Sequence, residues 1–379
     1  MLKTFPDECV DCIVTSPPYY GLRDYGVSDQ IGLEPSFGEY LERMLAVTAE
    51  LKRVLKSTGT MWWNHGDSYN GSGKAGGNKH YLKKHTQFGK LEKEERCGRP
   101  TFLKEMPTKS LMLQNFRLAQ RMIDEQGWYL RNVLIWWKPN CMPSSVRDRF
   151  TVDYEPLFFF TKSKKYWFEP QYEAFESNVY DRARMAKART EYGGKWAQES
   201  GGAIKTQRAF VAGHALGRNK RCVWRIPTRP FPGAHFAVFP EALVETPIKA
   251  GCPWMICRKC GKAREPIIKS QFRQHSIGAT SGRYYKERNF KGDNTVLNSS
   301  VTVGYTDCGC KAGWEPGIVL DPFMGSGTTA FVAQRLGRRW MGIELNPKYI
   351  KIAERRLGQA RVVKNLNQEG NEMIAACGA

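Results

Sequence analysis

The sequence contains a glycine-rich turn between two apolar segments in its last hundred residues. The stretch "GIVLDPFMGSGTTA" runs from an apolar segment into Asp321 and then into the turn that begins at Gly325. A second apolar segment, "RWMGIEL", ends near Glu344. Glycines in such a turn let the backbone approach a ligand closely, and an acid about 20 residues further on suits the hydroxyls of a ribose. The spacing therefore predicts a strand–turn–helix–strand unit that binds a nucleoside cofactor.

Four of the eleven cysteines are spaced like the ligands of a metal ion. Cys257 and Cys260 form a CxxC pair, and Cys308 and Cys310 form a CxC pair further along the chain. Four thiolates make the ligand set of a structural zinc ion, which can stabilise a segment that has little to bury. We therefore expect a structural zinc ion, held by these four residues. Four unrelated reduced thiols are the alternative.

A third unusual stretch, "DCIVTSPPYYGLRDYG", lies close to the N-terminus. Its apolar part is typical of a short buried strand. Pro17 and Pro18 stop that strand, because proline lacks the N–H that a sheet requires and has a fixed φ. Tyr19 and Tyr20 follow at once. The residues predict a rigid strand end that carries aromatic side chains.

Strand-like and helix-like segments alternate along the chain, which predicts a parallel or mixed α/β sheet. The expected strands include "DECVDCIVTS", "TMWWN", "WYLRNVLIWWK" and "EPLFFFTK". The expected helices include "FGEYLERMLAVTAELKRVLKSTG", which Gly59 would close, and "LMLQNFRLAQRMIDEQG". Residues 66–104 are rich in glycine, lysine and asparagine, and we expect them to form a mobile basic loop.

The composition favours a polyanionic partner. The 379 residues include 58 Lys and Arg against 37 Asp and Glu, which gives a formal net charge of +21. Such a charge favours binding to nucleic acid. No apolar run approaches the roughly 20 residues that span a bilayer, and the N-terminus "MLKTFPDECVDC" has no apolar signal-peptide region. We therefore expect an intracellular protein.

The proline motif and the glycine turn together resemble one family. "TSPPYY" followed much later by "DPFMGSGTTA" resembles the beta-class amino-methyltransferases of DNA, which transfer a methyl group from S-adenosylmethionine to the exocyclic nitrogen of cytosine or adenine. The resemblance covers most of the chain, including "GTMWWNHGDS" and "HFAVFPEALVETPIKAGCP". It implies a Rossmann-like methyltransferase sheet with circularly permuted motif order, the catalytic motif first and the cofactor turn last. It also implies DNA methylation with base flipping, a part in restriction-modification, and a location in the cytoplasm of a bacterial, archaeal or phage-infected host cell.

The resemblance also implies the catalytic residues, which are Ser16, Pro17, Pro18 and Tyr19. Ser16 and the Pro17 carbonyl would hydrogen-bond the target amine of a base flipped out of the duplex. Tyr19 would stack on that base, whereas core packing is the favoured role for Tyr20.

The implied cofactor-binding residues lie in and after the glycine turn. They are Asp321, Phe323, Gly325, Ser326, Gly327, Thr328, Thr329 and Glu344. The first five would line the methionine end of the cofactor, and the two threonines would lie at a helix N-terminus, which favours a carboxylate. Glu344 would hold the ribose hydroxyls.

The target base is less sharply indicated. Ser16, rather than an aspartate, at the head of the proline motif resembles the cytosine-N4 group, so N4 of cytosine is favoured and N6 of adenine is the alternative. A cytosine-C5 enzyme would use a cysteine after proline, and the chain has no Pro-Cys pair. Distant alternatives are a methyltransferase of RNA or protein amides, and a non-catalytic zinc-bearing DNA-binding protein.

The resemblance divides the chain into five parts. They are residues 1–170 and 314–379, the catalytic and cofactor halves of the methyltransferase domain; 171–230, the target-recognition region; 231–253, a return to the core; and 254–313, the zinc-binding insertion. Residues 181–230 carry twelve Lys or Arg against three Asp or Glu, and the insertion carries eleven against four. Both segments suit contacts with the phosphates of double-stranded DNA. A cognate restriction endonuclease is a second candidate partner.

Overall fold

The chain folds into two compact units. The computed structural model describes residues 1–71, 103–104, 106–173, 218–229, 238–276, 294–358, 361–366 and 372–378. One unit comprises residues 1–169, 222–263 and 310–379, and the other comprises 170–221 and 264–309. Most of the expected basic loop (66–104) and most of the expected target-recognition region (171–230) lie outside the described residues.

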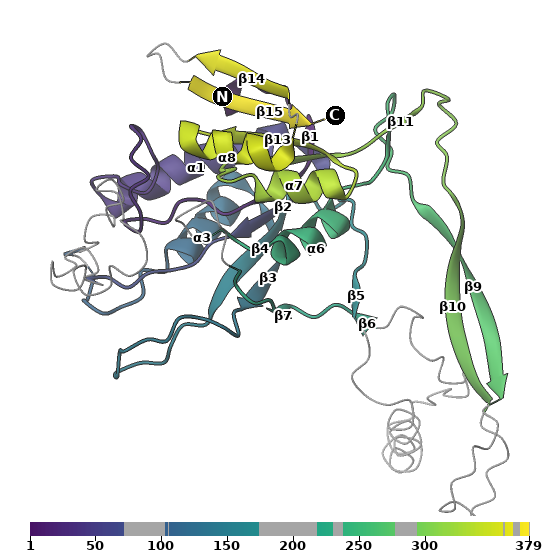
Figure 1. The fold of residues 1–379 in the computed structure, drawn as a ribbon, viewed down its shortest axis with the longest axis horizontal. Coiled ribbons are helices and arrows are strands. Elements are labelled where there is room, and N and C mark those ends of the chain that lie inside the picture. Colours follow the sequence, from purple (N-terminus) through teal and green to yellow (C-terminus); the bar gives the residue numbers. More distant parts are fainter. Residues whose placement is uncertain are drawn as a thin grey trace, which may run out of the picture. The chain divides into compact units, whose positions relative to one another are not determined.

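A mixed sheet of nine strands, in the order β14-β15-β13-β12-β1-β2-β4-β3-β7, organises the larger unit (Figure 1). In chain order its strands are β1 (Val10–Thr15), β2 (Leu55–Asn64), β3 (Tyr129–Trp137), β4 (Tyr154–Thr161), β7 (Val223–Arg225), β12 (Ile318–Asp321), β13 (Arg339–Glu344), β14 (Arg361–Leu366) and β15 (Glu372–Gly378). The helices are a short 3₁₀ turn η1 (Leu2–Thr4), α1 (Phe37–Val54), α3 (Gln114–Gln126), α6 (Glu241–Gly251), α7 (Thr328–Arg335) and α8 (Pro347–Leu357). Within the described part of the chain, no helix has the length and apolar character needed to cross a membrane.

Several strand ends meet at one edge of this sheet. Strand β1 pairs in parallel with both β2 and β12, and β12 pairs in parallel with β13. Strand β4 runs antiparallel to both β2 and β3, so β3 also points the same way as β1. The carboxyl ends of β1, β2, β3, β12 and β13 therefore share an edge, which is where open α/β sheets bind their ligands.

Helices cover both faces of the sheet, because its strands are apolar on both sides. Met61, Trp63, Phe158 and Phe160 pack with α1 and α3 on one face. Their neighbours Trp62, Leu157 and Phe159 pack with α6, α7 and α8 on the other face. The helix after β1 thus lies on the opposite face from the helix after β12, which opens a crevice between these two strands.

The helix over Phe37–Val54 begins as its sequence predicts but ends earlier. Ser36 caps the N-terminus, where its hydroxyl accepts a hydrogen bond from the Glu39 N–H at 3.2 Å. The expected end at Gly59 is wrong, since the chain becomes extended at Leu55. Leu55 pairs with Val10 of β1, so sheet pairing takes over before the glycine is reached.

Short sheets accompany the large one. Strands β8 (Ile256–Cys257) and β11 (Trp314–Glu315) pair in the larger unit. The smaller unit contains the pair β5 (Tyr172–Glu173) and β6 (Arg218–Asn219), and a long antiparallel hairpin of β9 (Pro266–Ser276) and β10 (Asn294–Tyr305). The hairpin and β8 lie within residues 254–313, the segment that sequence analysis treats as an insertion, and β11 follows directly after it.

Candidate active site

A cavity of about 630 Å³ opens at the carboxyl edge of the sheet, beside β1 and β12. Residues from both sequence motifs line it: Ser16, Pro17, Pro18 and Tyr19 from the first, and Phe323, Gly325, Ser326, Thr328 and Glu344 from the second. The fold thus brings together two segments that are about 300 residues apart in the sequence. Asp321, Gly327 and Thr329 lie directly beside the lining residues without lining the cavity themselves.

A direct hydrogen bond joins the two motifs beneath the cavity. The Thr15 hydroxyl, at the end of β1, donates to Asp321 Oδ1 at 2.6 Å. The Thr329 hydroxyl donates to the Val14 carbonyl at 3.1 Å. Both contacts are buried, so they fix the position of the proline motif relative to the glycine turn.

Tyr19 is held in place at the cavity wall. Its hydroxyl donates to Glu155 Oε2 at 3.1 Å, and its ring centroid lies 5.0 Å from that of His65. Gly66 makes room for the ring, because a Cβ at this position would lie only 2.9 Å from Tyr19 Cε2. Burial raises the pKa of Tyr19 well above its usual value, so the phenol stays neutral and can donate this hydrogen bond.

Tyr20 points into the core, which confirms the packing role expected for it. Its side chain is buried and lies 5.4 Å from the rings of both Phe37 and Tyr40. Its backbone N–H donates to Gln114 Oε1 at 2.9 Å. Adjacent tyrosines therefore have different roles, one at the cavity and one beneath it.

A buried hydrogen-bonded chain supports the two prolines. The Tyr40 hydroxyl donates to the Pro18 carbonyl at 2.9 Å and lies 3.2 Å from His65 Nε2. Trp63 Nε1 donates to His65 Nδ1 at 3.4 Å, which leaves Nε2 as the donor to Tyr40. Burial lowers the pKa of His65 to about 3, so this imidazole is neutral. The Pro18 carbonyl is thus occupied, whereas the described residues supply no donor to the Pro17 carbonyl.

Two side chains of the second motif, Asp321 and Ser326, are buried and carry polar atoms without hydrogen-bond partners among the described residues. Asp321 Oδ1 accepts bonds from Thr15 and from the Phe323 N–H at 3.1 Å, but Oδ2 has no partner among the described residues. The buried Ser326 hydroxyl also has none there. Burial raises the pKa of Asp321 to about 6. Buried polar atoms without partners are costly, so these two are suited to hydrogen-bond a ligand.

Glu344 closes the glycine turn from the end of β13. Its two carboxylate oxygens accept hydrogen bonds from the Gly325 N–H at 2.7 Å and from the Asn346 N–H at 2.8 Å. Burial raises its pKa above the usual range, although these backbone bonds oppose the shift. Each oxygen keeps a free lone pair, so the carboxylate can also accept hydrogen bonds from a diol.

The threonine hydroxyls at the start of α7 are already used by the protein. Thr328 Oγ1 accepts from Arg356 at 2.9 Å, and Thr329 bonds to Val14 as described above. The helix begins after Gly327, whose φ of +77° is left-handed and whose added Cβ would lie 3.0 Å from that of Ala353. This end of α7 therefore offers backbone N–H groups, rather than hydroxyls, to an anionic ligand group.

Sequence analysis missed an ion pair in the cavity wall. Lys138 follows β3, Glu155 lies near the start of β4, and their side chains form a salt bridge. The pair is mostly buried, with 18% and 21% of the side chains exposed. Both residues lie at the ends of segments that the sequence predicts to be strands. Those positions were the signal that could have identified them.

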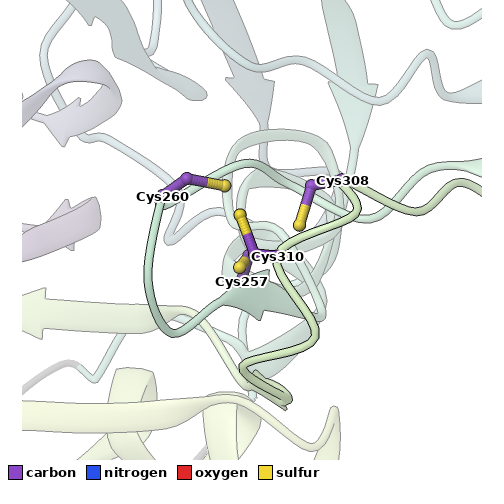
Figure 2. A group of neighbouring side chains, drawn as sticks. All are labelled: Cys257, Cys260, Cys308 and Cys310. Carbon is purple, nitrogen blue, oxygen red and sulfur yellow. The ribbon is translucent and has the colours of Figure 1, made fainter.

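The four predicted metal ligands lie close together. The sulfur atoms of Cys257, Cys260, Cys308 and Cys310 are within 4.8 Å of one another. Figure 2 shows the four side chains grouped together. None of the four forms a disulfide. The sulfurs of a tetrahedral Zn–S₄ site are about 3.8 Å apart, given Zn–S bonds of about 2.3 Å. The arrangement therefore fits a zinc ion with small adjustments of the side chains.

The sheet and its cavity form an α/β fold in which a glycine turn and an acid, suited to a nucleoside cofactor, lie beside a wall that carries Tyr19. The family of N6/N4 DNA methylases matches residues 10–253 and 314–355. The chain belongs to this family, and it is an S-adenosylmethionine-dependent DNA methyltransferase. The two matched segments are separated by residues 254–313, the segment that contains the cysteine cluster.

Several type II methyltransferases are similar over nearly the whole chain. M.XycI of Xanthomonas campestris pv. cyanopsidis and M.Cfr9I of Citrobacter freundii are each 34% identical, over 94% of this chain and 84% of their own length. M.SmaI of Serratia marcescens is 32% identical, over 93% of this chain and 86% of its own length. Among solved structures, the cytosine-N4-specific PvuII DNA methyltransferase aligns with a TM-score of 0.49 and 18% identity, over 94% of this chain and 83% of that chain.

Proposed function

We propose that this enzyme methylates the exocyclic amine of a base flipped out of double-stranded DNA at a specific site, and that the base is cytosine, methylated at N4. The observation that carries the proposal is the single cavity shared by the Ser16–Tyr19 motif and the glycine turn. Methylation at adenine N6 is the alternative.

The cofactor half of the cavity, together with Asp321 directly beside it, is suited to S-adenosylmethionine. Asp321 Oδ2 and Ser326 Oγ are buried without partners among the described residues, and they suit the ammonium and carboxylate groups of the methionine end. Glu344 suits the ribose hydroxyls. When bound, the cofactor supplies an electrophilic methyl group on a sulfonium.

We expect the affinity for S-adenosylmethionine to fall below about pH 6. The pKa of the free Asp321 carboxyl is raised to about 6, so below that pH the group is protonated and attracts an ammonium only weakly. Each pH unit below the pKa should cost up to about tenfold in affinity. Isothermal calorimetry between about pH 5 and 8 measures this. Asp321→Asn should bind weakly with little pH dependence over this range, and an unchanged pH profile in that variant would contradict the assignment.

The catalytic half of the cavity is suited to hold an amine. The Tyr40 hydroxyl already donates a hydrogen bond to the Pro18 carbonyl. The Pro17 carbonyl and the Ser16 hydroxyl are therefore the groups that can accept hydrogen bonds from the two N–H groups of the target amine. These two contacts would orient the nitrogen lone pair toward the methyl group. Positioning of the two reactants is then the main source of rate, and a covalent nucleophile is not required.

Two features favour cytosine as the target. Ser16, rather than an aspartate, begins the proline motif, as in the cytosine-N4 group that it resembles. Lys138 adds an ammonium donor to the cavity wall. Cytosine has the acceptors O2 and N3, whereas adenine has no carbonyl oxygen, so a cationic donor suits cytosine better.

Mass spectrometry of nucleosides decides between the two bases. Plasmid DNA methylated by the purified enzyme, with a labelled methyl group on the cofactor, should yield labelled N4-methylcytosine. Labelled N6-methyladenine would establish the alternative base. Labelled RNA or protein, with unlabelled DNA, would contradict the proposed substrate altogether. Sequencing of the same plasmid for modified bases would map the recognition site.

We also propose that Cys257, Cys260, Cys308 and Cys310 hold one structural zinc ion. The proximity of their sulfur atoms supports this, and so do the two turns that carry them. Gly261 and Gly309, each beside a cysteine, have left-handed φ angles of +67° and +72°. The matched family segments exclude residues 254–313, so the metal would stabilise an insertion rather than the catalytic core.

The remaining parts of the proposal concern DNA recognition. Residues 171–230 would read the DNA sequence, and residues 1–170, 231–253 and 314–379 would form a methyltransferase domain with circularly permuted motif order. The net charge of +21 supports extensive phosphate contacts. A cognate restriction endonuclease would act on the same site, in the cytoplasm.

A further inference from the structure

The loop between β3 and β4, residues 138–153, starts and ends at the rim of the cavity. Lys138, its first residue, and Glu155, the second residue of β4, both line the cavity. Figure 1 shows the loop projecting from the ends of these two strands. Its position relative to the proposed base site is therefore determined by the sheet.

Hydrogen bonds brace the base of this loop. The Lys138 N–H donates to the Asp153 carbonyl at 2.7 Å, and Trp137 Nε1 donates to Asp153 Oδ2 at 2.9 Å. Asn140 exchanges hydrogen bonds with the backbone of Thr228, at 2.9 and 2.8 Å. The loop thus leaves the rim in a defined direction.

Contacts near the far part of the loop hold residues 148 and 149. Asp148 forms an ion pair with Lys109 at 2.7 Å, and the Arg149 guanidinium lies over the ring of Tyr69 at 3.7 Å from its centroid. Phe150, the next residue, is 96% exposed. A large apolar ring is therefore presented to solvent directly after two residues that contact neighbouring side chains.

An exposed phenylalanine that follows two arginines has a clear chemical match in duplex DNA. Arg147 and Arg149 carry positive charge on the same exposed stretch, residues 142–152, which suits phosphates. Flipping a base leaves a gap in the stack, and apolar side chains inserted between bases can occupy such a gap. A flat ring on a loop that starts and ends at the rim of the base-binding cavity is suited to this position.

We propose that Phe150 inserts into the duplex and fills the space left by the flipped target base, while Arg147 and Arg149 contact the adjacent backbone. The inference rests on the proposed function, since it requires the target base to leave the stack. It assigns to this loop a part in catalysis that does not involve contact with the cofactor or the reacting amine.

The test compares two duplexes that contain the mapped recognition site. In one the target base is paired, and in the other it faces a mismatched base, which lowers the cost of flipping. Phe150→Ala should lower the single-turnover rate on the paired duplex by about tenfold or more. On the mismatched duplex its rate should approach that of the wild type. Phe150→Trp should retain most activity on both, and S-adenosylmethionine binding should be unchanged throughout.

Tyr129→Ala is the matched control, because Tyr129 is an exposed aromatic residue (39%) at the opposite end of β3. It should behave as the wild type on both duplexes. A loss in Phe150→Ala that is equal on both duplexes, or no loss at all, would overturn the proposal. So would sedimentation that shows wild-type self-association abolished by Phe150→Ala, since a second copy would then cover the ring. If the wild type methylates neither duplex, the proposed function itself fails.

Discussion

Replacement of Tyr19 by alanine is expected to lower the methylation rate by about 5- to 150-fold while cofactor affinity is unchanged. A stacked base contributes about 1–3 kcal/mol, which corresponds to that range of rates. Tyr19 lines the cavity, whereas the glycine turn that would bind the cofactor lies between β12 and α7. Single-turnover methylation of DNA and calorimetry with S-adenosylmethionine measure the two quantities separately.

Tyr19→Phe is the control that separates the ring from its hydroxyl. This variant keeps the stacking surface and loses only the hydrogen bond to Glu155. That bond is part-buried, so its loss should cost about 0.5–1.5 kcal/mol at most. We therefore expect Tyr19→Phe to keep much of the activity that Tyr19→Ala loses. Equal rates for both variants, or a normal rate for Tyr19→Ala, would exclude stacking as the role of this residue.

The double substitution Cys257→Ser, Cys260→Ser is expected to abolish the binding of one zinc ion per chain. Structural zinc in small sites contributes about 10–16 kcal/mol of binding free energy near neutral pH, and this energy is available for folding. The loss of two of the four thiolates should therefore destabilise the segment around them. Elemental analysis of wild type and variant measures the metal, and limited proteolysis of residues 254–313 measures the local effect.

The control for this pair is Cys9→Ser, Cys141→Ser, which changes two partly exposed cysteines outside the cluster. It should leave the zinc content at that of the wild type. Chelation of the wild type should weaken DNA binding more than cofactor binding, because the glycine turn lies outside the segment closed by the four cysteines. Wild-type protein without zinc, or equal zinc in both cysteine variants, would show that the cluster is not a metal site.

Local sequence determined the features whose partners are close along the chain. The glycine turn and Glu344 belong to one strand–helix–strand unit of fewer than 30 residues, so their relation follows from spacing alone. The same holds for the strand that ends before Pro17, since proline disrupts a sheet wherever it occurs. The CxxC and CxC pairs also marked the cysteine cluster, because each pair is set by its own turn.

Tertiary structure decided the features that depend on strand pairing. Helix α1 ends at Val54 because Leu55 pairs with Val10, a preference that the Gly59 signal could not reveal. Lys138 and Glu155 meet at the cavity only because β3 and β4 are antiparallel neighbours.

Tertiary structure likewise divided the roles of chemically identical groups. Tyr19 reaches the cavity while Tyr20 enters the core, since successive positions face different surroundings once α1 and α3 cover the sheet. The Thr328 hydroxyl bonds to Arg356 of α8, and the Thr329 hydroxyl bonds to Val14 of β1. Both partners are distant in the sequence. Motifs can therefore identify the chemistry of this enzyme from short-range pattern. Which atoms remain free to act is decided by long-range contacts, because each hydrogen bond made inside the fold removes a group from the site.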